Sequence, residues 1–211
     1  MEENQGFRLF RKIEKGEFFV VFGDCSQGGI DSNFVQFMSK TRGDIPLVYQ
    51  KQGVAAQMTP RLREALIWIF EQTGVKPVVA LERQNGGASE MDYLIEYNTG
   101  EYEIFYMKDR DGRPKLDKPG WDTSSTTRPN MLGEWLVAYE SREIIIYDAI
   151  TQEQHQTFIV NQKGRPEAAV NTHDDGVMSA AGAYQMYKTE NPKVKVHRPH
   201  KEVKRLKMHV R

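Results

Sequence analysis

The chain has 211 residues, 39% of them hydrophobic and 27% charged, which is the composition of a globular protein with one large domain or two small ones. No apolar run approaches the roughly 18 residues that a membrane-spanning helix needs, so the sequence predicts no membrane segment and no membrane partner. The polar residues at 1–6 do not resemble a signal peptide. A single cysteine, Cys25, excludes an internal disulfide and favours a reducing compartment.

Positive charge is concentrated near the end of the chain. The formal net charge is zero, but residues 188–211 hold nine Lys and Arg against two Glu, so the remainder has 20 basic and 27 acidic residues. A basic segment on an acidic body indicates an anionic partner, although a solvated chain end explains it equally well. We expect a lead-in over residues 1–16, a single domain over 17–190 and a basic C-terminal tail over 191–211.

The first half of the chain predicts a mixed β-sheet with a crossover helix. Three strands are expected to form an antiparallel meander: residues 17–23, 33–39 and 45–50. A helix is predicted to begin with Thr59 as N-cap and Pro60 as its first residue, and to end at Gly74. The next strand, over 77–81, is apolar throughout. A crossover helix between two apolar strands implies that they pair in parallel.

The second half predicts further helices and short strands around this sheet. Charged residues over 108–118 predict a protruding loop or hairpin around Asp111-Gly112. The other predicted elements are helices over 89–97, 129–141, 151–158 and 174–187, and strands over 102–107, 144–147 and 158–160. The last helix is rich in small residues, which allows close packing on a sheet. The expected fold class is α/β, with a mixed central sheet and helices on both faces.

Acidic residues follow two of the apolar strands and open the last helix. Asp24 ends the first strand, Glu82 follows the strand over 77–81, and Asp174 and Asp175 begin the helix. If the two strands are parallel neighbours, both acids emerge at one edge of the sheet, where the helix adds Asp175. Carboxylates this close repel one another unless cations hold them, and hard divalent cations prefer oxygen ligands. Two such ions about 3.5–4 Å apart form a device for in-line attack on phosphate.

Asp174 and Asp175 also have a simpler explanation, because acidic residues at a helix start are favoured by capping and by the helix dipole. Four stretches in this order make the functional explanation more specific: Gly23-Asp24 with Gly28-Gly29 and Asp31, residues 79–86 (VALERQNG), Gly120 to Thr123 through Thr127 to Pro129, and His173 to Val177. Together they resemble the C-terminal nuclease domain of the large terminase subunit of tailed bacteriophages, in the ribonuclease H-like superfamily. The resemblance covers about residues 6 to 190.

The resemblance implies a ribonuclease H-like fold and metal-dependent endonucleolytic cleavage of concatemeric viral DNA during genome packaging, with little sequence specificity. It implies two divalent cations, Mg²⁺ or Mn²⁺, as cofactors and double-stranded DNA as substrate. In the full-length protein it implies an ATPase domain, the small terminase subunit and the portal as partners. The expected location is the host cell cytoplasm.

The resemblance also assigns roles to the acidic residues. Asp24 is expected to bridge both cations, Glu82 to bind one of them, and Asp175, together with Asp174, to bind the other. Asp31 matches an extra acid that lies near the site in some members. All five are therefore candidate metal ligands, and the first four are candidate catalytic residues.

Basic residues around the acidic site are the expected DNA contacts. The charged segment contributes Lys108, Arg110, Arg113, Lys115 and Lys118, and the family has a hairpin near the site there. Arg83 and Arg128 flank the matched stretches and are expected to face DNA as well. Such residues bind phosphates with little sequence preference. A solvated charged turn explains the same segment without any ligand.

The chain departs from the family at Met178, where many members have an acid, and three alternative functions stay open. The first is another ribonuclease H-like nuclease, such as a junction resolvase, although the stretch from Gly120 to Pro129 argues against it. The second is a non-catalytic module that binds DNA or the portal and carries a vestigial acidic cluster. The third is a thiol enzyme built on Cys25, although a lone cysteine beside a core strand usually packs as a small hydrophobic residue.

Overall fold

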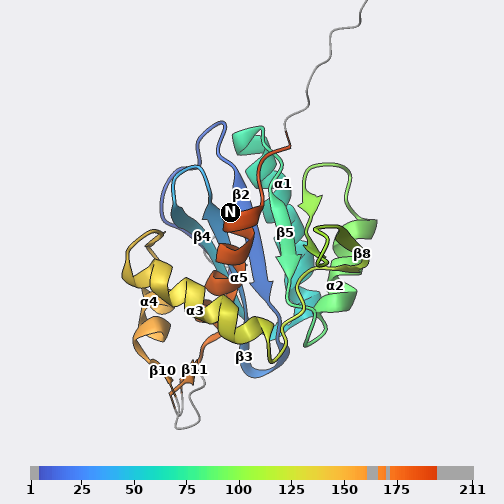
Figure 1. Cartoon of the computed structure of the whole chain (residues 1–211). Coiled ribbons are helices and arrows are strands. Elements are labelled where there is room, and N and C mark those ends of the chain that lie inside the picture. Colours follow the sequence, from blue (N-terminus) through green and yellow to red (C-terminus); the bar gives the residue numbers. More distant parts are fainter. Residues whose placement is uncertain (1–4, 161–165, 170–171, 194–211) are drawn as a thin grey trace, which may run out of the picture.

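The computed structural model describes residues 5–160, 166–169 and 172–193 (Figure 1). Its helices are α1 (Ala55–Thr73), α2 (Gly87–Glu96), α3 (Thr127–Glu140), α4 (Ala149–Gln156) and α5 (Asp175–Thr189). Its strands are β1 (Phe7–Leu9), β2 (Phe19–Asp24), β3 (Gln27–Ser39), β4 (Asp44–Val54), β5 (Val78–Leu81), β6 (Glu103–Ile104), β7 (Tyr106–Lys108), β8 (Pro114–Pro119), β9 (Ile145–Ile146), β10 (Phe158–Val160) and β11 (Pro166–Ala168). None of these helices is long and apolar enough to cross a lipid bilayer.

The central sheet is mixed, with the strand order β1-β4-β3-β2-β5-β6 and with β9 paired to β4. The meander of β2, β3 and β4 is antiparallel, as the sequence predicts. β2 and β5 are parallel neighbours in the register Phe22 to Ala80 and Gly23 to Leu81, which confirms the predicted crossover. Because β2, β4 and β5 all run in the same direction, their C-terminal ends lie at the same end of the sheet.

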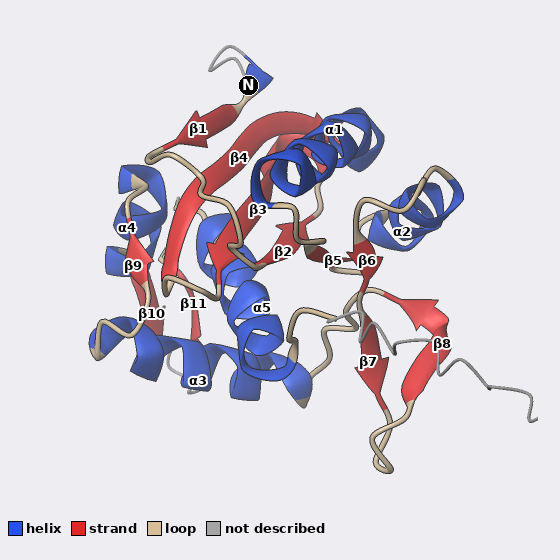
Figure 2. Cartoon of the chain, turned by 90° about the horizontal axis from the view of Figure 1, so that it is seen from above, coloured by secondary structure: helices blue, strands red, loops and turns tan. Residues whose placement is uncertain are grey.

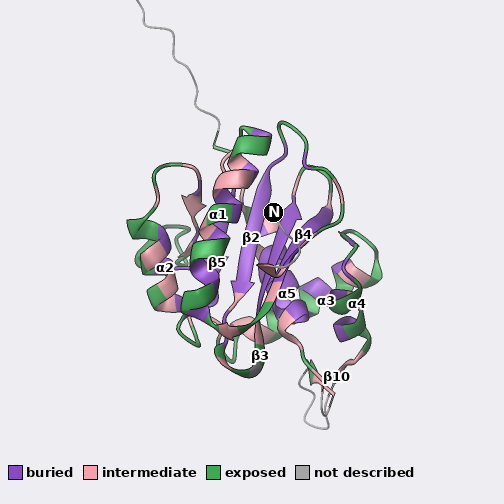
Figure 3. Cartoon of the chain, turned by 180° about the vertical axis from the view of Figure 1, so that it is seen from behind, coloured by how far each residue is buried: buried purple, intermediate pink, exposed green. Residues whose placement is uncertain are grey.

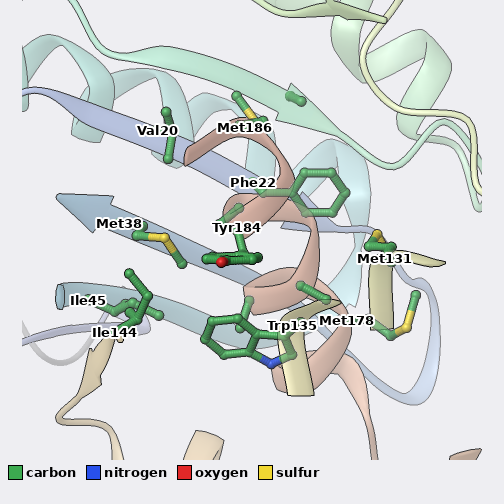
Figure 4. Packing of buried hydrophobic residues seen from close by; sticks show 14 of the residues in the cluster. Val20, Phe22, Met38, Ile45, Met131, Trp135, Ile144, Met178, Tyr184 and Met186 are labelled. Atoms are coloured by element: carbon green, nitrogen blue, oxygen red, sulfur yellow. The ribbon is translucent and has the colours of Figure 1, made fainter. Parts of the chain in front are cut away.

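Helices cover both faces of this sheet (Figures 1 and 2), because β2 is apolar on both sides. Phe19 and Val21 belong to the core under α1 and α2. Val20 and Phe22 belong to the core under α3 and α5, part of which is drawn in Figure 4. A Cβ on Gly182 of α5 would lie 2.5 Å from the Phe22 ring, so the small residues of this helix are needed for its close approach. The predicted two-sided α/β fold is confirmed, and Figure 3 shows its buried centre.

The predicted start of the long helix is wrong. α1 begins at Ala55, directly after β4, and Val54 occupies the N-cap position without a side-chain hydrogen bond. The Ala55 N–H donates instead to the Ser26 carbonyl oxygen at 3.0 Å, so a residue distant in sequence satisfies the helix end. Thr59 lies within the helix, where its hydroxyl donates to the Ala55 carbonyl oxygen, and Pro60 follows it inside the helix.

Both edges of the sheet differ from the sequence-based expectation. Part of the lead-in belongs to the folded unit, because β1 pairs with β4 and the side chains of Phe7 and Ile13 are buried. The strand predicted over 102–107 is interrupted at the buried Phe105, so that β6 continues the sheet and β7 leaves it. β7 and β8 form the predicted hairpin, which projects from the sheet in Figure 2. Residues 194–211 of the predicted basic tail lie outside the described residues.

Candidate active site

Asp24 and Glu82 are brought together by the parallel pairing of β2 and β5. Asp24 is the last residue of β2, and Glu82 comes directly after β5. The backbone of Glu82 is held on both sides, because its N–H donates to the Gly23 carbonyl oxygen at 2.9 Å and Trp121 pairs with it across the other edge. The stretch beginning at Gly120 therefore fixes an acid that lies about 40 residues earlier in the chain. Only 7% of Glu82 is exposed.

The turn after Glu82 has little room for side chains. A Cβ on Gly87 would lie 1.8 Å from the Glu82 carbonyl oxygen, so only glycine fits at the start of α2. Before it, Asn85 and Gly86 both have positive φ, at 53° and 90°. This tight turn places the amide side chains of Gln84 and Asn85 at the cavity into which Glu82 faces.

Asp174 and Asp175 lie at the start of α5, and the N–H group of the next residue is capped from another helix. The Gly176 N–H donates to Gln154 Oε1 of α4 at 2.6 Å. The Asp174 side chain accepts no capping hydrogen bond; it accepts one from Arg128 Nη2 at 3.0 Å. Asp175 Oδ2 accepts a hydrogen bond from the Ser32 N–H at 3.4 Å. Capping therefore does not explain Asp174, and both carboxylates are directed toward neighbouring elements.

Asp31 is carried on an arm of β3, residues 27–32, that extends beyond the end of β2. Ser26 and Asn33 fix the base of this arm: Asn33 Oδ1 accepts from the Ser26 N–H at 2.9 Å, and Ser26 Oγ donates to the Asp31 carbonyl oxygen at 3.1 Å. The Asp31 side chain is 62% exposed, and Nδ1 of His173 lies 3.8 Å from Oδ1 of Asp31. Asp31 is thus a peripheral member of the group.

All five predicted acids line one cavity of about 450 Å³ at this edge of the sheet. The cavity is also lined by residues that the sequence did not single out as ligands: Cys25, Ser26, Gln27, Gly28, Ser32, Gln84, Asn85 and Met178. Met178 is 3% exposed and packs with the core under α5 (Figure 4). An apolar side chain at this position closes the inner wall of the cavity.

Negative charge in this cavity is largely uncompensated. Burial raises the pKa of Asp24 well above its ordinary range, and the charges of Glu82, Asp175 and Asp174 raise it further. Burial also raises the pKa of Asp175 to about 6, in spite of the Ser32 N–H that favours its ionised form. Among the described lining residues the one cationic side chain is Arg128, and it is already paired with Asp174.

The architecture has counterparts among solved structures. The large terminase nuclease domain of Thermus phage P74-26 matches with a TM-score of 0.63 and 17% sequence identity, over 90% of this chain and 90% of that one. The large terminase nuclease of phage G20c with bound cobalt matches with a TM-score of 0.62 and 16% identity, over 85% and 87% of the two chains. The P22 large terminase nuclease domain matches with a TM-score of 0.52 and 13% identity, over 86% and 87%.

The chain has the fold of a large terminase nuclease domain. This confirms the ribonuclease H-like architecture that the sequence resemblance implied. No protein-family model matches the sequence, and no curated protein matches it, so the likeness is carried by structure. Solved structures of the G20c nuclease contain bound cobalt, magnesium or zinc, and the human cytomegalovirus terminase nuclease domain was soaked with manganese.

The acidic residues of this terminase nuclease fold suit a hard divalent cation. Burial and the charge of Glu82 raise the pKa of Asp24, so the two acids repel each other in this cavity when both are ionised. A cation at this position would relieve that repulsion. No three His, Cys, Asp or Glu side chains of the described ranges already form a coordination group.

Cys25 takes no part in this ionic cluster. Its side chain is buried in the core under α1, and the pKa of its thiol is raised by burial and by the nearby charges of Asp24 and Glu82. A thiol with a raised pKa stays protonated and is a poor nucleophile. The structure therefore favours the packing role of Cys25 over the thiol-enzyme alternative.

The predicted DNA contacts fall into three groups: one at the cavity, one at the base of the β7–β8 hairpin, and five on the hairpin itself. Arg128 lines the acidic cavity, whereas Arg83 pairs with Asp122 at 3.1 Å and donates to the Pro119 carbonyl oxygen at 2.8 Å, which ties the base of the β7–β8 hairpin to β5. The hairpin residues are exposed and do not line the cavity: Lys108, Arg110, Arg113, Lys115 and Lys118. Three of them have acidic neighbours within 4.0 Å, on Glu190, Asp111 and Asp122.

Proposed function

We propose that this chain is a divalent-metal-dependent DNA endonuclease, the nuclease domain of a large terminase subunit that cuts concatemeric viral DNA during genome packaging. One observation carries the proposal: Asp24, Glu82, Asp174 and Asp175 converge on one cavity whose negative charge is only partly neutralised, by Arg128. The shared fold with terminase nuclease domains supports the same function. Strongly perturbed acids in a cavity are typical of functional sites.

The proposed roles of the acids are those that the resemblance to terminase nuclease domains implies. Asp24, between Glu82 and the acids of α5, would contact both cations, Glu82 would hold one, and Asp175 with Asp174 would hold the other. When bound, two divalent cations supply an activated water and stabilise the leaving 3′ oxygen of a phosphodiester. The chain itself contributes rigid placement: β-sheet hydrogen bonds fix Glu82, Gln154 fixes the start of α5, and Arg128 orients Asp174. Mg²⁺ and Mn²⁺ are the ions proposed.

Plasmid cleavage tests this function. Supercoiled plasmid is incubated with the chain in Mg²⁺, in Mn²⁺ or in chelator, beside Asp24→Asn and the control Asp92→Asn, which changes an exposed acid of α2. We expect nicking and linearisation that need the metal, persist in Asp92→Asn and disappear in Asp24→Asn. Equal cleavage by Asp24→Asn would refute the assigned site. DNA binding without cleavage under any metal would favour the non-catalytic binding module.

Branched substrates separate the nuclease alternatives. A junction resolvase cuts four-way junctions in preference to linear duplex, whereas the proposed endonuclease cuts both at similar rates because it reads the backbone. Double-stranded DNA is the proposed substrate. The ATPase domain, the small terminase subunit, the portal and the host cell cytoplasm stay predictions, which binding assays with those components would test.

A further inference from the structure

A second cavity, of about 390 Å³, lies at the same end of the sheet between β4 and the first turns of α1. Two cationic side chains line it, from Lys51 of β4 and Arg61 of α1, together with the amides of Gln52 and Gln57. No Asp or Glu is found among the described residues of its wall, in contrast to the acidic cavity. Its chemistry is therefore that of an anion site built from cations and amide donors.

The charges of this basic pocket are available to a ligand. Lys51 is exposed and forms no ion pair with any described residue. Arg61 pairs with Glu64 at 3.0 Å, but both side chains are about half exposed, so water screens the pair and a ligand can compete with it. The first turn of α1 contains no acidic residue, and its N-cap has no side-chain hydrogen bond. The positive end of the helix dipole thus adds to the two cations.

The basic pocket and the acidic cavity share a wall. Ser32 lines the acidic cavity, and its partner in the β-ladder, Gln52, lines the basic pocket. Between them lies the buried side chain of Asn33, which accepts a hydrogen bond from the Ser26 N–H and donates one to the Gly53 carbonyl oxygen at 2.7 Å. These bonds keep the two sites at a fixed separation, on either side of the arm at residues 27–32.

We infer that the pocket formed by Lys51 and Arg61 binds a backbone phosphate of the same DNA that is cut in the acidic cavity. The inference rests on the proposed nuclease function. DNA approaching the acidic cavity meets five carboxylates and a single arginine that is already paired with Asp174, so nearby cations have to supply its affinity. A phosphate held beyond the arm would set the position of the duplex relative to Asp24 without reading its sequence.

The test measures the affinity for a fluorescent duplex in chelator, at several salt concentrations, and then cleavage in Mg²⁺. Lys51→Gln and Lys51→Glu are compared with Lys15→Gln and Lys15→Glu, which alter an exposed lysine before β2, at the other end of that strand. We expect Lys51→Gln to weaken DNA binding several-fold, to reduce the slope of log K against log salt by about 1, and to raise KM with kcat unchanged. The Lys15 variants should match the wild type.

Each outcome is decisive. If the wild type cleaves plasmid but the Lys51 variants bind and cleave like the Lys15 variants, the basic pocket is not a DNA site, and the proposed nuclease stands. If the wild type binds DNA through Lys51 but does not cleave with any metal, the nuclease proposal fails, and the DNA-binding role of the pocket is retained. A loss of kcat alone in Lys51→Gln would also overturn the inference, because a phosphate contact outside the acidic cavity acts on binding.

Discussion

Carboxylates gather near both ends of β2, but the protein compensates their charge to different degrees. Before β2, Glu17 and Asp44 face the guanidinium of Arg11, which donates two hydrogen bonds to each of them at 2.6–2.9 Å. These bonds lower the pKa of Glu17 even though burial acts to raise it. At the other end, no residue of the described ranges forms an ion pair with Asp24, and burial and the charge of Glu82 raise the pKa of Asp24.

This difference separates the structural cluster around Arg11 from the proposed functional cluster around Asp24. A buried carboxylate without a partner is costly, so it persists only where another benefit keeps it. The cluster around Arg11 is complete, since Ser39 and Tyr147 also donate to its acids at 2.9 and 3.2 Å. In the proposed function, a bound cation completes the cluster around Asp24. The proposed site is therefore distinguished by acidic charge that the protein leaves largely uncompensated, because acidic residues occur in both clusters.

The largest expected effect is the loss of cleavage when an acid of the uncompensated end is neutralised. Glu82→Gln keeps the shape of the side chain but removes one charged ligand. We expect plasmid cleavage to fall by at least about 10³-fold, because groups that act as a unit fail together. Its free energy of unfolding should stay equal or rise, because a charge facing Asp24 is removed. The matched control Glu17→Gln should cleave at the wild-type rate per folded molecule.

The second-largest expected effect is a loss of stability when the Arg11 cluster, before β2, is disrupted. Arg11→Ala leaves Glu17 and Asp44 buried without their cation, and both are at most 4% exposed in their side chains. We expect the free energy of unfolding, measured in urea, to fall by about 3 kcal/mol. Arg42→Ala, which breaks an exposed pair with Glu14 at 2.7 Å, should change it by no more than about 0.5 kcal/mol. Equal losses in the two variants would contradict the comparison.

Patterns local in sequence were enough to predict how the acids converge. The apolar strands that precede Asp24 and Glu82, with a helix between them, predict parallel neighbours and hence a common edge, and the structure has that pairing. The position of Asp175 at the start of a helix rich in small residues likewise predicted close packing on the sheet. These inferences need only the periodicity and order of the elements.

Contacts between distant segments were not predictable in this way. Nothing near Ala55 indicates that Ser26 accepts its N–H, so the helix start was placed at Thr59. Arg83 and Arg128 flank the matched stretches equally, yet only Arg128 reaches the acidic cavity, because Arg83 is drawn to Asp122 and the hairpin base. The choice between such arginines depends on the tertiary fold, which a linear pattern does not contain.

The acidic groups at the two ends of β2 should also make the free energy of unfolding depend on pH in opposite directions. The pKa of Asp175 is about 6 in the folded protein and 3.8 ordinarily, so the folded state holds the proton more tightly. Stability from this group is present below about pH 4 and is lost as the pH rises to about 6. The lowered pKa of Glu17 acts in reverse, since its contribution is lost as the pH falls below its ordinary value of 4.5.

Unfolding of the metal-free protein between pH 4 and 7 measures these slopes. We expect the wild type to lose about 2 kcal/mol relative to Asp175→Asn as the pH rises through this window. Addition of Mg²⁺ at pH 7 should recover stability in the wild type and much less in Asp175→Asn, because the cation replaces the missing counter-charge. A difference between the two proteins that does not vary with pH would show that Asp175 is ionised throughout.

The smallest effect on cleavage is expected at Asp31, whose carboxylate belongs to neither the Arg11 cluster nor the buried part of the acidic cavity. Its side chain is 62% exposed, so water already solvates its charge and no arginine is needed to hold it, unlike Glu17. His173, 3.8 Å away, screens it further when protonated. Exposed charges contribute about 0.2–1 kcal/mol, so Asp31→Asn should reduce cleavage at saturating Mg²⁺ by no more than about fivefold. A loss as large as that of Glu82→Gln would instead place Asp31 among the metal ligands, because only direct coordination makes so exposed a carboxylate indispensable.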